Sequence, residues 1–389
     1  MPQRPGRSAL VVAVGITIVT NIPLFLVGAL AVTIADDIRL PTWALGIASA
    51  AFWVFAAAAS ALAGTVARLM SARGFAIITI VLATASLVGL AAATPSWQAM
   101  VVWTALAGVS NGFGHPASNA LLNTTIRPTR LAVAFGIKQS AVPLSGLIAG
   151  VSLPLIALTL GWHAVFVAAA VGGGVLLVAF AAISAHRRER ADRRAPRPAR
   201  ISGPLLRRLL LMSGGTLLTG GAATALAAFF TTAGVERGVE PALAGTILAL
   251  GTALSATTRL LMGGLAGRRE INPLRTIAVL ALAGGVGALA MTIPGPGFYI
   301  AGFLIATGIG WGWPGLVHFS ISRIAKDSTL AATGIVQTGT YLGSTISPIV
   351  VGLILAVPSA SGFAWLTLGC MSLGGAVMFT LADRFAPRV

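Results

Sequence analysis

Long apolar runs follow one another through the chain, and their length limits what it can fold into. A bilayer core is spanned by about 20 consecutive apolar residues as a helix, because a helix satisfies its backbone hydrogen bonds without water. Hydrophobic residues make up 56% of the 389 and charged residues only 9%, against about a quarter in soluble domains. The sequence therefore predicts an all-α polytopic membrane protein. The twelve predicted spans are 8–31, 43–66, 74–93, 99–122, 132–157, 164–185, 209–232, 242–265, 275–294, 298–321, 330–356 and 362–382.

The basic residues lie mostly on one side of this predicted topology. The chain has 26 Lys and Arg against 9 acids, a net charge of +17. Nearly all of the basic residues fall in the termini and the even-numbered connections, and the odd-numbered connections hold only Arg39 and Arg237. Basic loops stay in the cytoplasm, so we expect a multi-pass protein of the cell (inner or plasma) membrane with both termini cytoplasmic. Sidedness accounts for the charge, and no nucleic-acid partner is expected.

A basic segment and a set of repeats divide the chain into two halves. Residues 185–208 contain nine arginines and form the longest polar stretch, which predicts a solvated linker. AGTVAR (63–68) aligns with GGLAGR (263–268), GVSNG (108–112) with GIGWG (308–312), and GIKQS (136–140) with GIVQT (334–338). Their shared order and similar offsets indicate a duplicated six-helix unit, a known way to build transporters. We predict bundles at 1–185 and 209–389, joined by a cytoplasmic linker at 186–208.

With twelve spans, a 6+6 division and a basic central loop, the chain resembles the major facilitator superfamily. The signature of that family after spans two and eight combines glycine, small apolar residues and arginine. GGLAGRR (263–269), with Gly264 and Arg268, matches it well, and Gly64 and Arg68 match it in the first half. The acidic residue that the family places before the arginine is absent from both copies. The resemblance implies two bundles related by a pseudo-two-fold axis, alternating access gated at these four residues, and a monomer.

Span five adds two further points to the resemblance. GIKQSAVPLSG, together with GWGWPGL in span ten, is similar to the cyanate-permease-like branch of the superfamily. Gly146 and Gly150 form a small-xxx-small step that allows close helix approach, so we assign them a gating role as well. The Gly-Pro-x-x-Gly-Gly ending typical of drug/proton antiporters is not found in this span. This departure argues against a typical drug antiporter.

Two basic side chains, Lys138 and Arg259, lie within predicted spans, whereas all nine acids lie in connections or at span ends. A lysine at bilayer depth costs roughly 2.5 to 3.5 kcal/mol on insertion scales. Lys138 is about 9 to 10 Å from the cytoplasmic end of its helix, since each residue adds about 1.5 Å. Both side chains could therefore extend to the interface or face the interior. If both face inward, they place two positive charges in the cavity, which an anionic solute would balance.

Polar residues recur at three- and four-residue steps in several spans, so they share helix faces that hydrocarbon would not tolerate. Such faces either glue helices together or line a solvated cavity. Spans four and ten would offer different walls, one with amides and an imidazole and the other with an indole and an imidazole. The candidate substrate-binding residues are Asn21, Asn111, His115, Asn119, Lys138, Arg259, Trp311, His318, Gln337 and Tyr341.

These features favour a secondary active or facilitative transporter of a small solute, and an anion rather than a cation. Efflux of metabolites or amphipathic drugs is the alternative, because the cavity walls are otherwise small and apolar. The spans contain no zinc-protease motif, nucleophile elbow or paired carboxylates, so an intramembrane enzyme is not expected. A non-transporting sensor is not expected either, because no polar stretch is long enough for a soluble domain. No cofactor is expected. The partners expected are the solute and the lipid bilayer.

Overall fold

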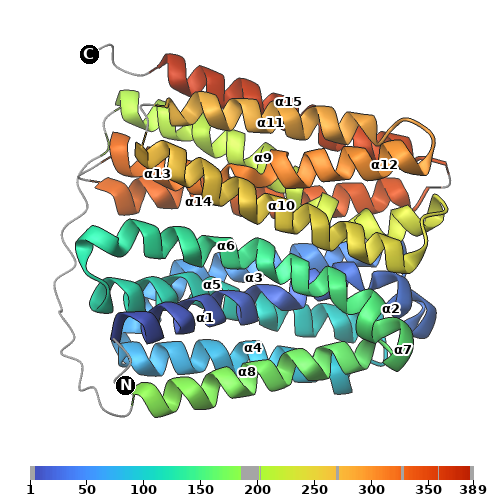
Figure 1. The fold of residues 1–389 in the computed structure, drawn as a ribbon, viewed down its shortest axis with the longest axis horizontal. Helices are drawn as coiled ribbons and strands as arrows, with labels where there is room; N and C mark the ends of the chain where they lie inside the picture. The colour runs from blue at the N-terminus through green and yellow to red at the C-terminus, as the bar shows by residue number, and fades with distance from the viewer. Residues whose placement is uncertain are drawn as a thin grey trace.

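The computed structural model describes residues 5–184, 201, 203–268, 271–325, 328–357 and 359–385, and these residues form helices and short connections without any strand (Figure 1). The first half comprises α1 (Pro5–Ala29), α2 (Ala31–Ile38), α3 (Thr42–Leu69), α4 (Ala72–Ala92), α5 (Trp97–Thr125), α6 (Pro128–Ser152), α7 (Leu158–Leu160) and α8 (Trp162–Ser184). The second half comprises α9 (Gly203–Glu236), α10 (Pro241–Arg268), α11 (Pro273–Ala290), α12 (Pro296–Phe303), α13 (Pro314–Ile324), α14 (Thr329–Leu355) and α15 (Ser361–Arg384).

Within the described residues, eleven helices or helix series are long and apolar enough to cross a membrane. The remaining predicted span is α5, a helix of 29 residues whose polar face lowers its mean hydropathy. The all-α, multi-span fold predicted from the sequence is thus confirmed. Residues 186–200 of the predicted linker lie outside the described part of the chain. Residues 203–208 were predicted as linker, and this was wrong, because they form the first turns of α9.

The helices group into two bundles, the first half in blue to green and the second in yellow-green to red (Figure 1). The start of α1 and the end of α15 lie at the same end of the molecule. We call this the split end, because the apolar cores of the two halves are separate there. One cluster contains Val12, Phe75 and Phe113 of the first half, and another contains Met212 and Phe379 of the second.

At the opposite end, which we call the joined end, both halves contribute to a single apolar core. This cluster includes Phe25 and Phe166 from the first half with Phe229 and Trp365 from the second. Backbones also meet there. The Thr231 hydroxyl in α9 donates to the backbone carbonyl of Gly28 in α1 over 2.7 Å. Among the described residues, the halves therefore share an apolar core at the joined end and have separate apolar cores at the split end.

The joined-end contact depends on glycines that admit a neighbouring backbone. A methyl group at Gly150 of α6 would lie 2.5 Å from the backbone nitrogen of Ala249 in α10. At Gly46 of α3 it would collide with the Pro348 carbonyl of α14. The small-xxx-small step of span five thus packs helix against helix across the two halves.

Two of the predicted spans are not regular helices. Span five continues from α6 through a π-helical turn, η1 (Leu153–Ala157), into α7. Span ten runs through α12, a π-helical turn η2 (Leu304–Ile309), a 3-10 turn η3 (Gly310–Gly312) and α13. In the latter, Pro314 cannot donate a backbone hydrogen bond, and Trp311 has non-helical angles of φ −93° and ψ 18°. The break leaves backbone carbonyls free for side chains.

Candidate functional site

Lys138 lies in the interior of the first half and does not extend to the interface. Its side chain is only 1% exposed. The amine Nζ donates to Oδ1 of Asn119 over 2.8 Å and lies 3.2 Å from Nδ1 of His115. Both partners belong to α5, one helical turn apart, and α6 follows α5 after a short connection. Burial with two neutral partners excludes snorkelling for this lysine.

His318 of α13 brings the second half to the same cluster. It lies within electrostatic range of both Lys138 and His115. Its side chain is exposed, although it comes from a membrane-spanning segment. Since Lys138 belongs to α6 and His318 to α13, this interaction brings groups of the two halves together. The polar faces predicted on spans four and ten therefore meet at one site.

Arg259 of α10 forms a second group with the break in span ten. Its Nε donates to the Trp311 carbonyl over 3.2 Å, and its Cζ lies 4.8 Å from the centroid of the Trp311 ring. Its Nη1 reaches the Gln139 carbonyl of α6 over 3.4 Å, so the guanidinium bridges the two halves. The Ser255 hydroxyl donates to the same Trp311 carbonyl. Arg259 therefore faces the interior, and its contacts are to neutral groups.

A third group lies between α3 and α14. The Tyr341 side chain is hydrogen-bonded to Ser60 and Gln337, and its ring centroid is 6.0 Å from that of Trp53. The indole nitrogen of Trp53 is buried without a hydrogen-bond partner. Sequence reasoning missed Trp53 and Ser60. Trp53 could have been noticed, because tryptophan in membrane proteins is enriched at the interfaces and this one lies mid-span.

Two of the predicted binding residues are turned towards helix packing. Nδ2 of Asn21 donates to the Thr17 carbonyl of its own helix over 2.7 Å, and Asn21 is 4% exposed. Nδ2 of Asn111 donates to the Thr20 carbonyl of α1 over 3.4 Å, and its Oδ1 is buried without a partner. The structure thus uses the Asn21 amide within α1 and places the Asn111 amide at the α1–α5 contact.

The residues assigned to gating fall into two groups. Gly146 and Gly150 are packed against α10, as described above for Gly150. Gly64 and Gly264 have open space around them, since an added methyl would meet no atom within 4 Å. Arg68 is exposed and bonds to Thr65 of its own helix. The side chain of Arg268 lies outside the described residues.

The acids of the described residues lie away from these basic groups. Asp36 and Asp37 of α2 are exposed at the joined end, and Asp37 accepts a hydrogen bond from the Trp162 indole. Asp383 of α15 forms an ion pair with Arg275 at 2.8 Å. Among the described residues, no carboxylate therefore forms an ion pair with Lys138 or Arg259.

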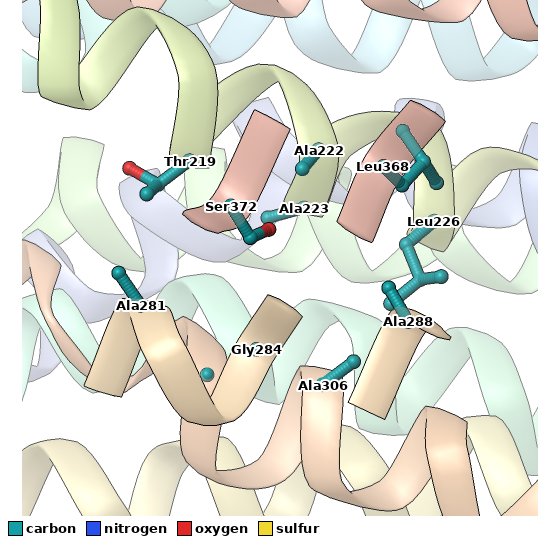
Figure 2. A pocket seen from close by; sticks show the side chains of 11 residues that line it. Thr219, Ala222, Ala223, Leu226, Ala281, Gly284, Ala288, Ala306, Leu368 and Ser372 are labelled. Atoms are coloured by element: carbon teal, nitrogen blue, oxygen red, sulfur yellow. The ribbon is translucent and has the colours of Figure 1, made fainter. Parts of the chain in front are cut away.

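A small cavity lies inside the second half and is separate from this site. It has a volume of about 20 Å³ and is lined by small residues of α9, α11, η2 and α15, with the hydroxyls of Thr219 and Ser372 (Figure 2). This is room for about one water molecule. Because none of its lining residues is charged, we do not regard it as the solute site.

Comparison with known proteins identifies the family. The sequence profile described as "Major Facilitator Superfamily" matches residues 8–348. The chain belongs to this superfamily. The resemblance predicted from sequence is confirmed at this level, and the cyanate-permease-like branch stays a prediction. A comparison of this chain with curated protein sequences found no match.

Solved transporters share the fold at low sequence identity. A bacterial homolog of the human lysosomal transporter Spinster, inward-facing and occupied, aligns with TM-score 0.74 and 16% identity over 99% of this chain and 98% of its own. Its inward-facing, unoccupied form gives 0.69 and 14% over 99% and 97%. A mutant of the nucleoside transporter NupG gives 0.71 and 15% over 97% and 100%. These structures share the fold of the chain, and its membership of the superfamily together with its apolar helices makes it a multi-pass membrane transporter.

Proposed function

We propose that the protein is a secondary transporter of small organic or inorganic anions that works by alternating access. The observation that carries this proposal is the buried amine of Lys138, which is held by Asn119 and His115 and not by a carboxylate. Arg259 lies in the neighbouring helix with only carbonyl and ring contacts. An anion entering between the halves would supply the missing negative charge, and a cation would be repelled.

The two ends of the molecule support alternating access. The halves share one apolar core at the joined end, whereas their apolar cores are separate at the split end. Rocking of the halves about the site would close the split end and open the joined end. From the distribution of basic residues we infer that the split end faces the cytoplasm of a cell membrane. We infer that the unit that moves is a monomer.

Uptake into proteoliposomes tests the proposal. The purified chain would be offered labelled formate, acetate, nitrate, sulfate and phosphate, with and without a pH gradient. We expect saturable uptake of at least one anion, slowed by roughly 30-fold or more in Lys138→Ala and Arg259→Ala, since loss of a buried charged partner costs about 2 kcal/mol or more. Arg275→Ala, which removes an exposed arginine, is the matched control.

The efflux alternative has a different outcome. If the protein moves amphipathic cations or neutral compounds, and both variants do so as fast as the wild type, the anion proposal is wrong. Size-exclusion chromatography of each variant before reconstitution separates loss of transport from loss of fold.

A further inference from the structure

The guanidinium of Arg259 is anchored on two sides by neutral acceptors. The broken helix in span ten presents the Trp311 carbonyl to Nε, and α6 presents the Gln139 carbonyl to Nη1. The indole face of Trp311 lies under Cζ, a favourable cation–π arrangement. These contacts orient the group while leaving its charge uncompensated.

The third nitrogen, Nη2, is buried and has no hydrogen-bond partner. A guanidinium does not give up its proton in proteins, so a buried donor of this kind stays charged and unsatisfied. Burying such a donor without a partner costs free energy in this conformation. An acceptor that reaches it in another state of the transport cycle would offset that cost. The two N–H groups on one edge of a guanidinium match the planar fork of a carboxylate.

On the basis of the proposed function, we propose that Arg259 binds the carboxylate group of the solute through its Nη2 edge, and that this pair replaces the hydrogen bond to Gln139. The transported class is then carboxylates rather than spherical or tetrahedral anions. Lys138, whose amine has one donor beyond its two contacts, provides a second positive charge in the adjoining helix.

The exchange couples binding to the contact between the halves. The Nη1 bond to Gln139 is long at 3.4 Å and therefore weak, whereas charge-assisted bonds to a carboxylate are about 2.7 to 2.9 Å long. Nη2 is sealed in the present conformation, so the carboxylate reaches it as the guanidinium leaves Gln139. Since Gln139 belongs to the first half and Arg259 to the second, occupancy releases a bond between them.

The first test compares Arg259→Lys with the wild type, because lysine keeps the charge but lacks the fork. Binding of formate, acetate, benzoate, chloride and sulfate to the full purified chain is measured by calorimetry. We expect carboxylate affinity to fall by about tenfold or more in Arg259→Lys and to change by less than about threefold in the control Arg275→Lys.

Three results would overturn the inference. Carboxylate affinity in Arg259→Lys within about threefold of the wild type would remove Arg259 as the ligand, while leaving anion transport in place. A wild type that binds only chloride or sulfate would exclude the carboxylate class but not the anion proposal. A wild type that binds none of the five anions would overturn the anion proposal together with this inference.

A second test addresses the coupling. Gly136→Cys is introduced into a Cys370→Ser background, because Gly136 has open space around it and Cys370 is the only native cysteine. We expect saturating acetate to change the maleimide labelling rate of this cysteine by about threefold or more, and not to change it when Arg259→Lys is also present. An equal rate with and without acetate would show that binding does not release the contact between the halves.

Discussion

The α6 segment around Lys138 and the α14 segment around Val336 occupy equivalent places in the two halves. In both, the central side chain is buried, 1% exposed for Lys138 and 2% for Val336. In both, the hydroxyl of the residue two positions further on donates to a carbonyl of its own helix. Ser140 donates to Gly136 over 3.2 Å, and Thr338 donates to Gly334 over 2.9 Å. The two segments thus share a buried central side chain and a hydroxyl bond at equivalent positions.

The surroundings of these two side chains differ. Lys138 faces the amide of Asn119 and the imidazole of His115, whereas Val336 belongs to an apolar cluster with Trp313 and Phe379. One helical framework thus accommodates either a charged or an apolar residue at the same depth. Because the second half folds with an apolar residue at this position, the helical framework does not depend on a lysine there.

The largest expected effect comes from moving the charge to the other half. Val336→Lys would bury an ammonium in the apolar cluster that includes Trp313 and Phe379. We expect a loss of about 3 kcal/mol or more and little folded protein, measured by size-exclusion chromatography and thermal unfolding in detergent. Val336→Ile is the control. A Val336→Lys protein with the same unfolding temperature as Val336→Ile would show that the positions of Lys138 and Val336 both tolerate a buried ammonium.

The converse change should affect transport and not the fold. Lys138→Met makes α6 resemble α14 and removes a buried charge, so we expect an unchanged or higher unfolding temperature. We expect anion uptake to fall by about 30-fold or more, as for Lys138→Ala. Uptake at the wild-type rate, with the protein folded, would contradict a solute-binding role for this lysine.

A smaller effect is expected from the amide that holds the lysine. Asn119→Ala removes one acceptor from a charged donor, a loss of about 1.5 to 3 kcal/mol in such pairs. Anion affinity should therefore fall by roughly tenfold or more in a binding assay. Asn123→Ala, on the same helix but exposed, should leave affinity unchanged. Equal effects of the two changes would mean that Asn119 acts only through the stability of α5.

The smallest effect is expected where the two halves are alike. Ser140→Ala and Thr338→Ala each remove a hydroxyl that bonds only within its own helix, according to the hydrogen bonds described here. We expect changes within about 0.5 kcal/mol and no effect on uptake. A much larger effect in one half than in the other, seen in thermal unfolding or uptake, would show that the repeated geometry conceals a functional asymmetry.

The sequence alone determined the membrane architecture and the superfamily. Apolar runs long enough to cross a bilayer have to be helical there, because hydrocarbon offers no partner for an open backbone. The ordered matches such as GIKQS and GIVQT predicted the duplication, and the signature glycines and arginines predicted the superfamily. These properties follow from local composition and spacing, which do not require knowledge of neighbouring helices.

Only the tertiary structure decided where the charged side chains point. In the sequence, Lys138 is near enough to the helix end for its amine to reach the interface. A buried side chain and one that extends to the interface were therefore equally compatible with the sequence. The position of Asn119 and His115 on α5 settled it, since a contact between helices depends on how they rotate and cross. For the same reason, the sequence could not show that Arg259 reaches across to Gln139, or that Asn21 bonds within its own helix.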